Sequence, residues 1–594
     1  MSSRAADELV DLVEVCPGVT LVRDTCNVYA LRSGREAVLV DFGAGTALDR
    51  LPELGVDRVT DILLTHHHRD QLQGLERAAR AGIRIWAPPT ERELIEDVDR
   101  HWRSRPLDND YDLRQDRFSL LHPVPVTGSV AEYRTRRYGA IVAFTLPTPG
   151  HTIGSVTFLV EHGGRRLAFC GDLVYGEGRL WSLAATQWTY TGSEGQIATS
   201  ISCALLADRR PDLLLPSHGP PVRDPGRALE LTRTRLAELI VLRRGEPWDF
   251  DEWFRHPWRK LSPHLLASRT SMATSYALVS DSGHALLIDW GYDLWTGSAL
   301  ASDRAARRPL LTSLEGLDVE VVVPTHYHDD HVAGINLLRD VSGAEAWIAD
   351  RFADVLAHPR RYDLPCLWYD PVPADRVLAA GRPVCWREYE LTLHPLPGHT
   401  RYQVAVEFQV DGRRVLATGD QQQGRILNYQ YRNRFAIDDY IRGARLYASL
   451  SPDVILGGHC PPQEVDEEYL AQLAADGRRV AELHRALLPL EEVDAGAEGS
   501  LARIEPYRPV VAAGDSLDVE VEVPAGPAEV ALVLGAGWTA EPSRVALTEA
   551  GTARFSVTPA PVPVRRARLA AEVTVGGVPY GQQAEALVDV VDPR

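Results

Sequence analysis

The sequence has few of the features that would place a protein in a membrane or outside the cell. No apolar run approaches the roughly 18 residues that are needed to cross a bilayer. The first residues carry acidic side chains and no apolar core of signal-peptide length. The seven cysteines are scattered and never in C-x-x-C spacing, which disfavours a disulfide framework and a zinc finger. We therefore expect a cytoplasmic protein with mostly buried, free thiols.

Basic residues are also scarce relative to acidic ones. Lys and Arg number 63 against 82 Asp and Glu, the formal net charge is −19, and Lys260 is the only lysine. No dense run of basic residues could follow a phosphate backbone or an anionic membrane surface. We expect a small-molecule substrate and neither a nucleic acid nor a membrane as partner, while the oligomeric state stays open.

The length of the chain indicates several domains. Its 594 residues exceed the roughly 250 to 300 residues at which a single core stops growing. The contents of apolar residues (45%) and charged residues (24%) are ordinary for globular proteins, which argues against extensive disorder.

The chain contains an internal duplication. Four motifs occur twice in the same order and with similar spacing. They are DILLTHHHRDQ (61–71) and EVVVPTHYHDDH (320–331), TPGHT (148–152) and LPGHT (396–400), CGDL (170–173) and TGDQ (418–421), and PSHGPP (216–221) and GGHCPP (457–462). Each polar cluster follows a short apolar, β-rich run, and helical patterns at 69–82 and 331–343 follow the first motif of each copy. The pattern predicts sheets covered by helices, with the polar clusters meeting at one sheet edge.

These patterns suggest three domains, at 8–240, 255–490 and 500–594. Residues 223–250 have a charged, helical pattern, and 243–253 is the expected join between the two copies. The last region alternates strand-like runs with turns and predicts a small antiparallel β-sandwich. Its segment 537–551 resembles bacterial immunoglobulin-like modules, and a spacer without a ligand is the alternative interpretation.

The second copy carries the residue types that bind transition metals. Its candidates are His326, His328, Asp330, His331, His399, Asp420 and His459. Imidazole and carboxylate groups suit zinc, iron or manganese. The series T-H-x-H-x-D-H, G-H-T, G-D and G-H resembles the metallo-β-lactamase superfamily over roughly 10–235 and again 262–485. The resemblance implies an α/β protein with two tandem αββα metallo-β-lactamase sandwiches and a small C-terminal all-β sandwich.

The resemblance also implies a role for each of these side chains. His326, His328 and His399 would hold a first divalent ion, Asp330, His331 and His459 a second, and Asp420 would bridge them. Asp330 and Asp420 would also be catalytic, since Asp330 can orient a nucleophile or carry a proton. Zinc is the ion that we expect, although iron and manganese accept the same ligands.

The first copy departs from the family pattern at one position. It matches with His66, His68, Asp70, His151, Asp172 and His218, but Gln71 stands where the family has a histidine. The neutral amide oxygen of Gln71 replaces imidazole poorly toward zinc. We expect one ion at His66, His68 and His151, a weakened second position, and an accessory or degenerate domain. His67 and Tyr327 are interpreted as packing residues or as neighbours of ligands.

An aromatic segment follows each bridging Asp, at 173–192 and 421–440. Related enzymes line their substrate pocket with this region, so Tyr429, Tyr431, Arg432 and Arg434 are candidates for binding an anionic substrate. Ordinary helix and loop surface is the competing interpretation.

The favoured function is hydrolysis of an ester, thioester, lactone or similar small molecule by a metal-bound hydroxide in the second copy. The first alternative is a mononuclear iron sulfur dioxygenase, a class that the superfamily also contains. The second alternative is a non-catalytic metal-binding or regulatory protein. Tandem tRNA-maturation nucleases of this superfamily share only the domain order.

Overall fold

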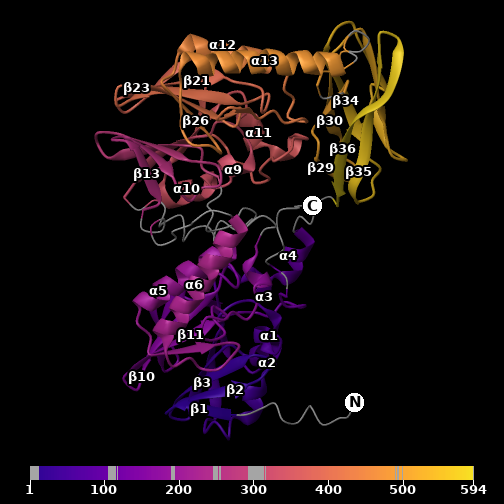
Figure 1. Cartoon of the computed structure of the whole chain (residues 1–594). Coiled ribbons are helices and arrows are strands. Elements are labelled where there is room, and N and C mark those ends of the chain that lie inside the picture. Colours follow the sequence, from indigo (N-terminus) through magenta and orange to yellow (C-terminus); the bar gives the residue numbers. More distant parts are fainter. Residues whose placement is uncertain are drawn as a thin grey trace. The chain divides into compact units, whose positions relative to one another are not determined.

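The computed structural model describes residues 12–104, 116, 118–188, 194–244, 252, 256–291, 314, 316–488, 490, 494, 496–497 and 500–592. The described residues fall into two compact units, unit 1 (12–257) and unit 2 (258–592). Figure 1 draws unit 1 in indigo to magenta and unit 2 in pink to yellow. Most of the expected join at 243–253 lies outside the described residues.

Unit 1 is built on two sheets. The first contains seven strands in chain order, β1 (Leu12–Cys16), β2 (Val19–Arg23), β3 (Asn27–Ser33), β4 (Glu36–Val40), β5 (Arg58–Leu63), β6 (Arg84–Ala87) and β7 (Gly128–Ser129). The second has the order β12-β11-β10-β9-β8, with β8 (Thr135–Tyr138), β9 (Ile141–Pro147), β10 (Val156–His162), β11 (Arg165–Gly171) and β12 (Leu213–Pro216). In the first sheet the pairing changes from antiparallel to parallel at β4.

Helices cover the outer faces of these sheets, which gives four layers. Along β4, Val38 and Val40 face a core that both sheets share, whereas Ala37 and Leu39 face a core beneath the helices. That second core includes residues of α1 (Arg69–Leu72), α2 (Leu75–Arg80) and α3 (Glu93–Glu96). On the other side, α5 (Glu194–Asp208) and α6 (Pro225–Arg244) pack against the second sheet. The predicted αββα sandwich is confirmed.

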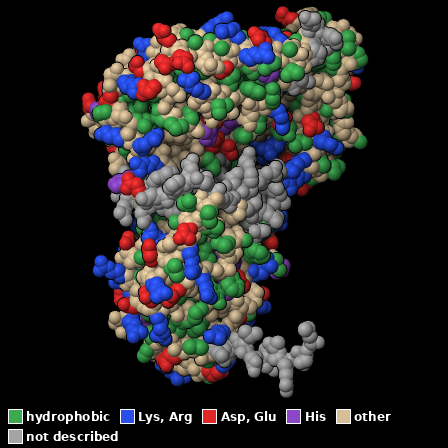
Figure 2. Space-filling model, viewed as in Figure 1, with side chains coloured by type: hydrophobic (Ala, Val, Ile, Leu, Met, Phe, Trp, Pro, Cys, Tyr) green, Lys and Arg blue, Asp and Glu red, His purple; other side chains and the backbone are tan. Residues whose placement is uncertain are grey.

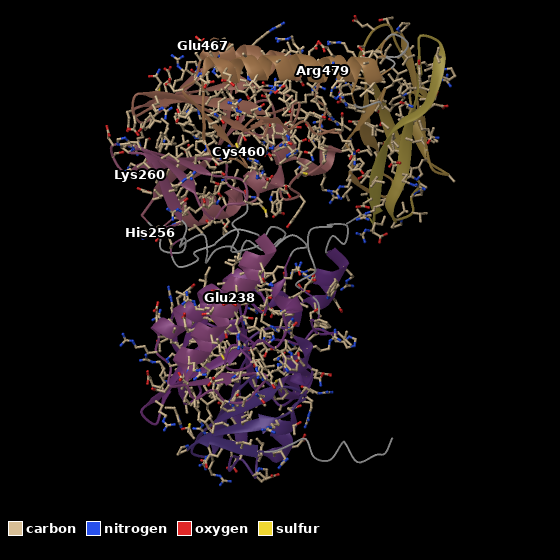
Figure 3. The ribbon with its side chains drawn as sticks, in the orientation of Figure 1. Glu238, His256, Lys260, Cys460, Glu467 and Arg479 are labelled. Carbon is tan, nitrogen blue, oxygen red and sulfur yellow. The ribbon has the colours of Figure 1, made fainter. Side chains whose placement is uncertain are left out.

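Unit 2 repeats this architecture. Its first sheet contains, in chain order, β13 (Trp258–Ser262), β14 (Leu265–Ser268), β15 (Tyr276–Val279), β16 (His284–Ile288), β17 (Asp318–Val323), β18 (Glu345–Ala349) and β19 (Arg376–Leu378). Its second has the order β20-β21-β22-β23-β26-β27, with β20 (Pro383–Trp386), β21 (Tyr389–Pro395), β22 (Val404–Val410), β23 (Arg413–Gly419), β26 (Val454–Gly457) and β27 (Gln463–Glu464). The helices α12 (Asp439–Leu450) and α13 (Glu467–Leu487) pack on the second sheet. Glu467 and Arg479 mark α13 in Figure 3.

The helical pattern after each first motif forms two short helices instead of one. In unit 1 the break between α1 and α2 falls at Gly74, and in unit 2 the break between α9 (Asp329–Val332) and α10 (Ile335–Ser342) falls at Gly334. A Cβ on Gly74 would lie 2.4 Å from the carbonyl carbon of Ala44, and a Cβ on Gly334 would lie 2.6 Å from the oxygen of Gly291. The helix breaks where the chain approaches another backbone too closely for any side chain.

The C-terminal region of unit 2 is all β. One sheet has the order β28-β30-β34-β32, with β28 (Arg503–Glu505), β30 (Leu517–Val523), β32 (Thr539–Glu541) and β34 (Gly551–Thr558). The other has the order β29-β36-β35-β31-β33, with β29 (Val510–Ala512), β31 (Ala528–Val533), β33 (Arg544–Leu547), β35 (Val564–Val575) and β36 (Val578–Val591). Both sheets contribute to one apolar core, so they form a sandwich. Its likeness to immunoglobulin-like modules stays a prediction.

The surface shows no segregation of charge on the face drawn in Figure 2, where acidic, basic and apolar side chains are mixed over both units. Within the described parts of the chain, none of the helices combines the length and the apolar composition needed to span a membrane.

Candidate metal centres

The candidate ligands of unit 2 lie at or just after the ends of strands. His326 and His328 follow β17, His399 follows β21, Asp420 directly follows β23, and His459 follows β26. Asp330 and His331 lie in α9, which begins one residue after His328. The motif residues therefore meet at one edge of the two sheets, as the sequence predicts.

A three-histidine group is the first of two clusters in unit 2. The ligand nitrogens of His326, His328 and His399 lie within 4.8 Å of one another, and all three side chains are buried. Burial, and then the neighbouring imidazoles, hold the pKa of His326 well below its ordinary value, and burial lowers the pKa of His328 to about 3. The imidazoles are therefore neutral, which is the form that binds metal ions.

Each of these imidazoles is oriented through its other nitrogen. Thr325 Oγ1 lies 3.2 Å from His326 Nδ1, and Asn433 Oδ1 lies 3.1 Å from His328 Nε2. His399 Nδ1 donates to the carbonyl of Asn428 at 2.7 Å. Bonds of this kind fix the tautomer and the ring direction of metal-binding histidines.

The second cluster combines two imidazoles with two carboxylates, those of Asp330, His331, Asp420 and His459. His459 Nε2 lies 3.0 Å from Asp330 Oδ2 and 3.2 Å from Asp420 Oδ2. Burial opposes a charge on His459, but both carboxylates outweigh it and raise its pKa to about 9. His331 Nδ1 lies 2.8 Å from Asp289 Oδ2, which orients that ring.

Asp420 contacts both clusters. One carboxylate oxygen lies 3.2 Å from His331 Nε2, and the other lies 3.7 Å from His399 Nε2 of the three-histidine group. Its position therefore suits a bridging ligand.

Buried polar atoms between the two clusters indicate that cations fit there. His326 Nε2, His331 Nε2 and Asp420 Oδ1 are buried and have no aligned hydrogen-bond partner within the described residues, although His331 Nε2 and Asp420 Oδ1 lie 3.2 Å apart. Leaving such atoms without a partner costs about 1–3 kcal/mol each. Divalent ions would give all three a partner, and imidazole with carboxylate is a suitable donor set for zinc, iron or manganese.

Unit 1 has only one such cluster among its described residues. His66, His68 and His151 form a three-histidine group like that of unit 2. The Gln71 amide turns toward Asp70, with its nitrogen 2.7 Å from Asp70 Oδ1 in the orientation that satisfies both groups.

His218 of unit 1 lies between two carboxylates. Its Nε2 is 3.2 Å from Asp70 Oδ2, and its Nδ1 is 2.9 Å from Asp172 Oδ1. The Trp181 ring stacks on the His218 ring at 4.0 Å and lines a cavity of about 420 Å³ beside His68 and His151. Both nitrogens of His218 are therefore engaged with side chains of the protein.

A second difference accompanies Gln71. In unit 2, Asp289 Oδ2 accepts from His331, and in unit 1 the matching oxygen, Asp41 Oδ2, accepts from the Ser217 hydroxyl at 2.6 Å. Ser217 corresponds to Gly458, since their backbone nitrogens donate to the matching Gly171 and Gly419 at 2.8 and 2.9 Å.

The glycine of unit 2 is required by the ligands around it. A Cβ on Gly458 would lie 2.1 Å from Asp420 Oδ1 and 2.8 Å from His331 Cε1. The serine hydroxyl therefore replaces the hydrogen bond of the missing histidine and occupies space that this histidine needs to be free of any side chain.

A family model for the metallo-beta-lactamase superfamily matches residues 21–240 and 269–459, which together are more than half of the chain. The chain belongs to the metallo-beta-lactamase superfamily. Several of the proteins that it is similar to are named hydroxyacylglutathione hydrolase. The Methylobacterium nodulans protein is 32% identical over 133 residues, and the Shewanella pealeana protein is 27% identical over 175 residues.

These alignments cover only part of each protein. They span 22% and 28% of this chain, and 40% and 54% of the two relatives. A solved metallo-beta-lactamase from Cronobacter sakazakii with a HARLDQ motif is 18% identical, with a TM-score of 0.31 over 40% of this chain and 97% of that chain.

The aromatic segment of this superfamily member is partly engaged in internal contacts. Tyr429 and Tyr431 are 40% and 50% exposed, and the Tyr431 hydroxyl lies 3.0 Å from His484 Nε2. Arg432 is exposed and lies 3.5 Å from Asp363. These three residues stay candidates for substrate binding.

Arg434 does not fit that role. Its side chain is buried and donates to Tyr402 and to Glu505, a residue of the C-terminal sandwich. We therefore remove Arg434 from the substrate-binding candidates, because its guanidinium is committed to partners within the protein.

The first cluster also depends on a residue that lies between Arg432 and Arg434. Asn433 is buried, and its Oδ1 accepts from the Tyr327 hydroxyl and lies beside His328. Tyr327 is thus a neighbour of a candidate ligand, and His67 in unit 1 is buried 3.2 Å from Glu91. No motif identifies Asn433, because its role depends on the contact between its loop and His328, which follows β17.

Proposed function

We propose that unit 2 is a metal-dependent hydrolase that binds two divalent ions, zinc above all, and cleaves an ester or thioester of a small acid. The observation that carries the proposal is the pair of adjacent clusters in unit 2, joined at Asp420. Two ions there would supply Lewis acidity and make water acidic enough to act as a nucleophile near neutral pH.

The side chains of the protein support such chemistry in separate ways. The three neutral imidazoles lie in a buried environment, whereas Asp330 is partly exposed at the side of His459. A carboxylate in that position can orient water or accept its proton. Asp420 contacts both clusters and would hold them at a fixed distance from each other.

The relatives favour a thioester among the possible substrates, because several of them carry the name hydroxyacylglutathione hydrolase. Two clusters also favour a dinuclear hydrolase over a mononuclear iron sulfur dioxygenase. We propose that unit 1 binds one ion at His66, His68 and His151 and serves as an accessory domain.

The test is a panel of acyl-glutathione thioesters, chromogenic esters and lactones, measured with metal analysis of the same protein sample. We expect turnover of at least one thioester or ester, loss of turnover after chelation, and recovery with zinc. A protein that binds both ions in unit 2 and turns over no member of the panel would contradict the proposal. Oxygen consumption with a persulfide would favour the dioxygenase instead.

A further inference from the structure

The loop 428–435 of unit 2 holds two of the three histidines of the first cluster. The carbonyl of Asn428 accepts from His399 Nδ1, and Asn433 Oδ1 lies beside His328 Nε2. This loop therefore sets the direction of both rings.

The backbone of the loop is strained on both sides of Asn433. Arg432 has φ 69° and Arg434 has φ 60°, in the left-handed region that non-glycine residues rarely adopt. Such conformations persist only where surrounding contacts hold them. The loop needs an anchor close to Asn433.

Arg434 is one anchor, beside the Arg401 amide that donates to the Asn433 carbonyl at 2.8 Å, and the partner of Arg434 comes from the C-terminal sandwich. Arg434 is only 8% exposed, and its Nη1 donates to Tyr402 at 3.0 Å and to Glu505 Oε1 at 3.2 Å. Glu505 ends β28, and its other oxygen accepts from Arg361 Nε at 3.0 Å. A buried guanidinium requires a charged partner, because an unpaired buried charge is strongly unfavourable.

We propose that Glu505 is a positioning residue for the metal centre of unit 2. This proposal rests on the proposed function only because it requires that the centre binds metal. Through Arg434, Glu505 holds Asn433 against His328. The C-terminal sandwich is then a structural part of the centre and not a spacer.

The test compares Glu505→Gln with Glu520→Gln in the full chain. Glu520 lies in the same sandwich, 3.7 Å from Arg361, and also binds Arg554. Both variants carry His151→Ala, so that only unit 2 contributes to tight binding. Chelator competition with zinc measures the affinity, the visible absorption of the cobalt-loaded protein reports the ligand geometry, and circular dichroism checks folding.

We expect Glu505→Gln to weaken the tightest zinc binding roughly tenfold. This is the lower end of the loss of affinity that follows when a group that orients a metal ligand is removed. We also expect a changed cobalt spectrum. Glu520→Gln should match the parent protein, and Glu505→Asp should recover part of the affinity. Equal affinities and superimposable spectra for Glu505→Gln and the parent would overturn the proposal.

Two further arms keep the result decisive. If Glu505→Gln does not fold, Arg434→Lys probes the same link from the other side, and unchanged zinc affinity in that variant would overturn the proposal. If Glu505→Gln loses affinity while no ester or thioester is turned over by the parent, the positioning role stands and the hydrolase proposal fails.

Discussion

The two units share the same layers and the same three-histidine group but differ in the cluster beside it. In unit 2, His331 and Gly458 allow a second cluster, whereas Gln71 and Ser217 occupy these positions in unit 1. In each unit one member of the pair donates to the matching buried aspartate: His331 to Asp289 in unit 2, and Ser217 to Asp41 in unit 1. The comparison teaches that the proposed second metal position depends on two coupled residues, only one of which is a candidate ligand.

Among substitutions outside the candidate ligands, the largest effect is expected from adding a single methyl group in unit 2. Gly458→Ala would place a carbon against Asp420 and His331, so we expect the protein to lose one ion. We also expect turnover to fall by roughly 100-fold or more, which is at least the upper end of the cost of changing groups that surround a metal ion. Metal analysis and thioester turnover check this. Ser217→Ala, the matched change in unit 1, should leave both unchanged. A Gly458→Ala protein with its full metal content would break the comparison.

A smaller effect is expected where the loop supports His328. Asn433→Ala removes the acceptor beside His328 Nε2, and we expect zinc affinity to fall about 10- to 100-fold. Chelator competition measures the change. Asn428→Ala is the control, because Asn428 holds His399 through its backbone carbonyl, which the substitution keeps. Similar losses in both variants would show that the Asn433 side chain has no special role.

The smallest effect on turnover is expected from rebuilding the second cluster in unit 1. Gln71→His alone should gain no ion, because Ser217 occupies the space and the hydrogen bond that the new histidine requires. Gln71→His combined with Ser217→Gly should gain one ion per chain, while turnover stays that of unit 2. A gain of metal with Gln71→His alone would show that the two positions are independent.

The sequence pattern predicted sheets covered by helices because each apolar run is short and ends in a polar motif, whereas the αββα order of the layers followed from the resemblance to the metallo-β-lactamase superfamily. It also placed the three histidines of each unit together, since the ends of neighbouring strands meet at one sheet edge. Asp289 carries the same signal, a polar residue directly after the buried β16, and could have been found.

Other features could not be predicted from local patterns. The Ser217 hydroxyl reaches an aspartate far away in the sequence, and Glu505 acts through Arg434 across two folded regions. Arg434 is a candidate by its place in the segment with which related enzymes line their substrate pocket, whereas its burial depends on a partner in the sandwich. The split helices depend on close backbone approaches at Gly74 and Gly334 that only the folded chain reveals.

Turnover and metal content of His399→Ala and His151→Ala, prepared in parallel, test the central claim most directly. We expect His399→Ala to lose turnover by several orders of magnitude. His151→Ala should lose one ion and keep the turnover of the parent protein. Equal loss of turnover in both variants would contradict the account, because it would make the two units partners in one reaction.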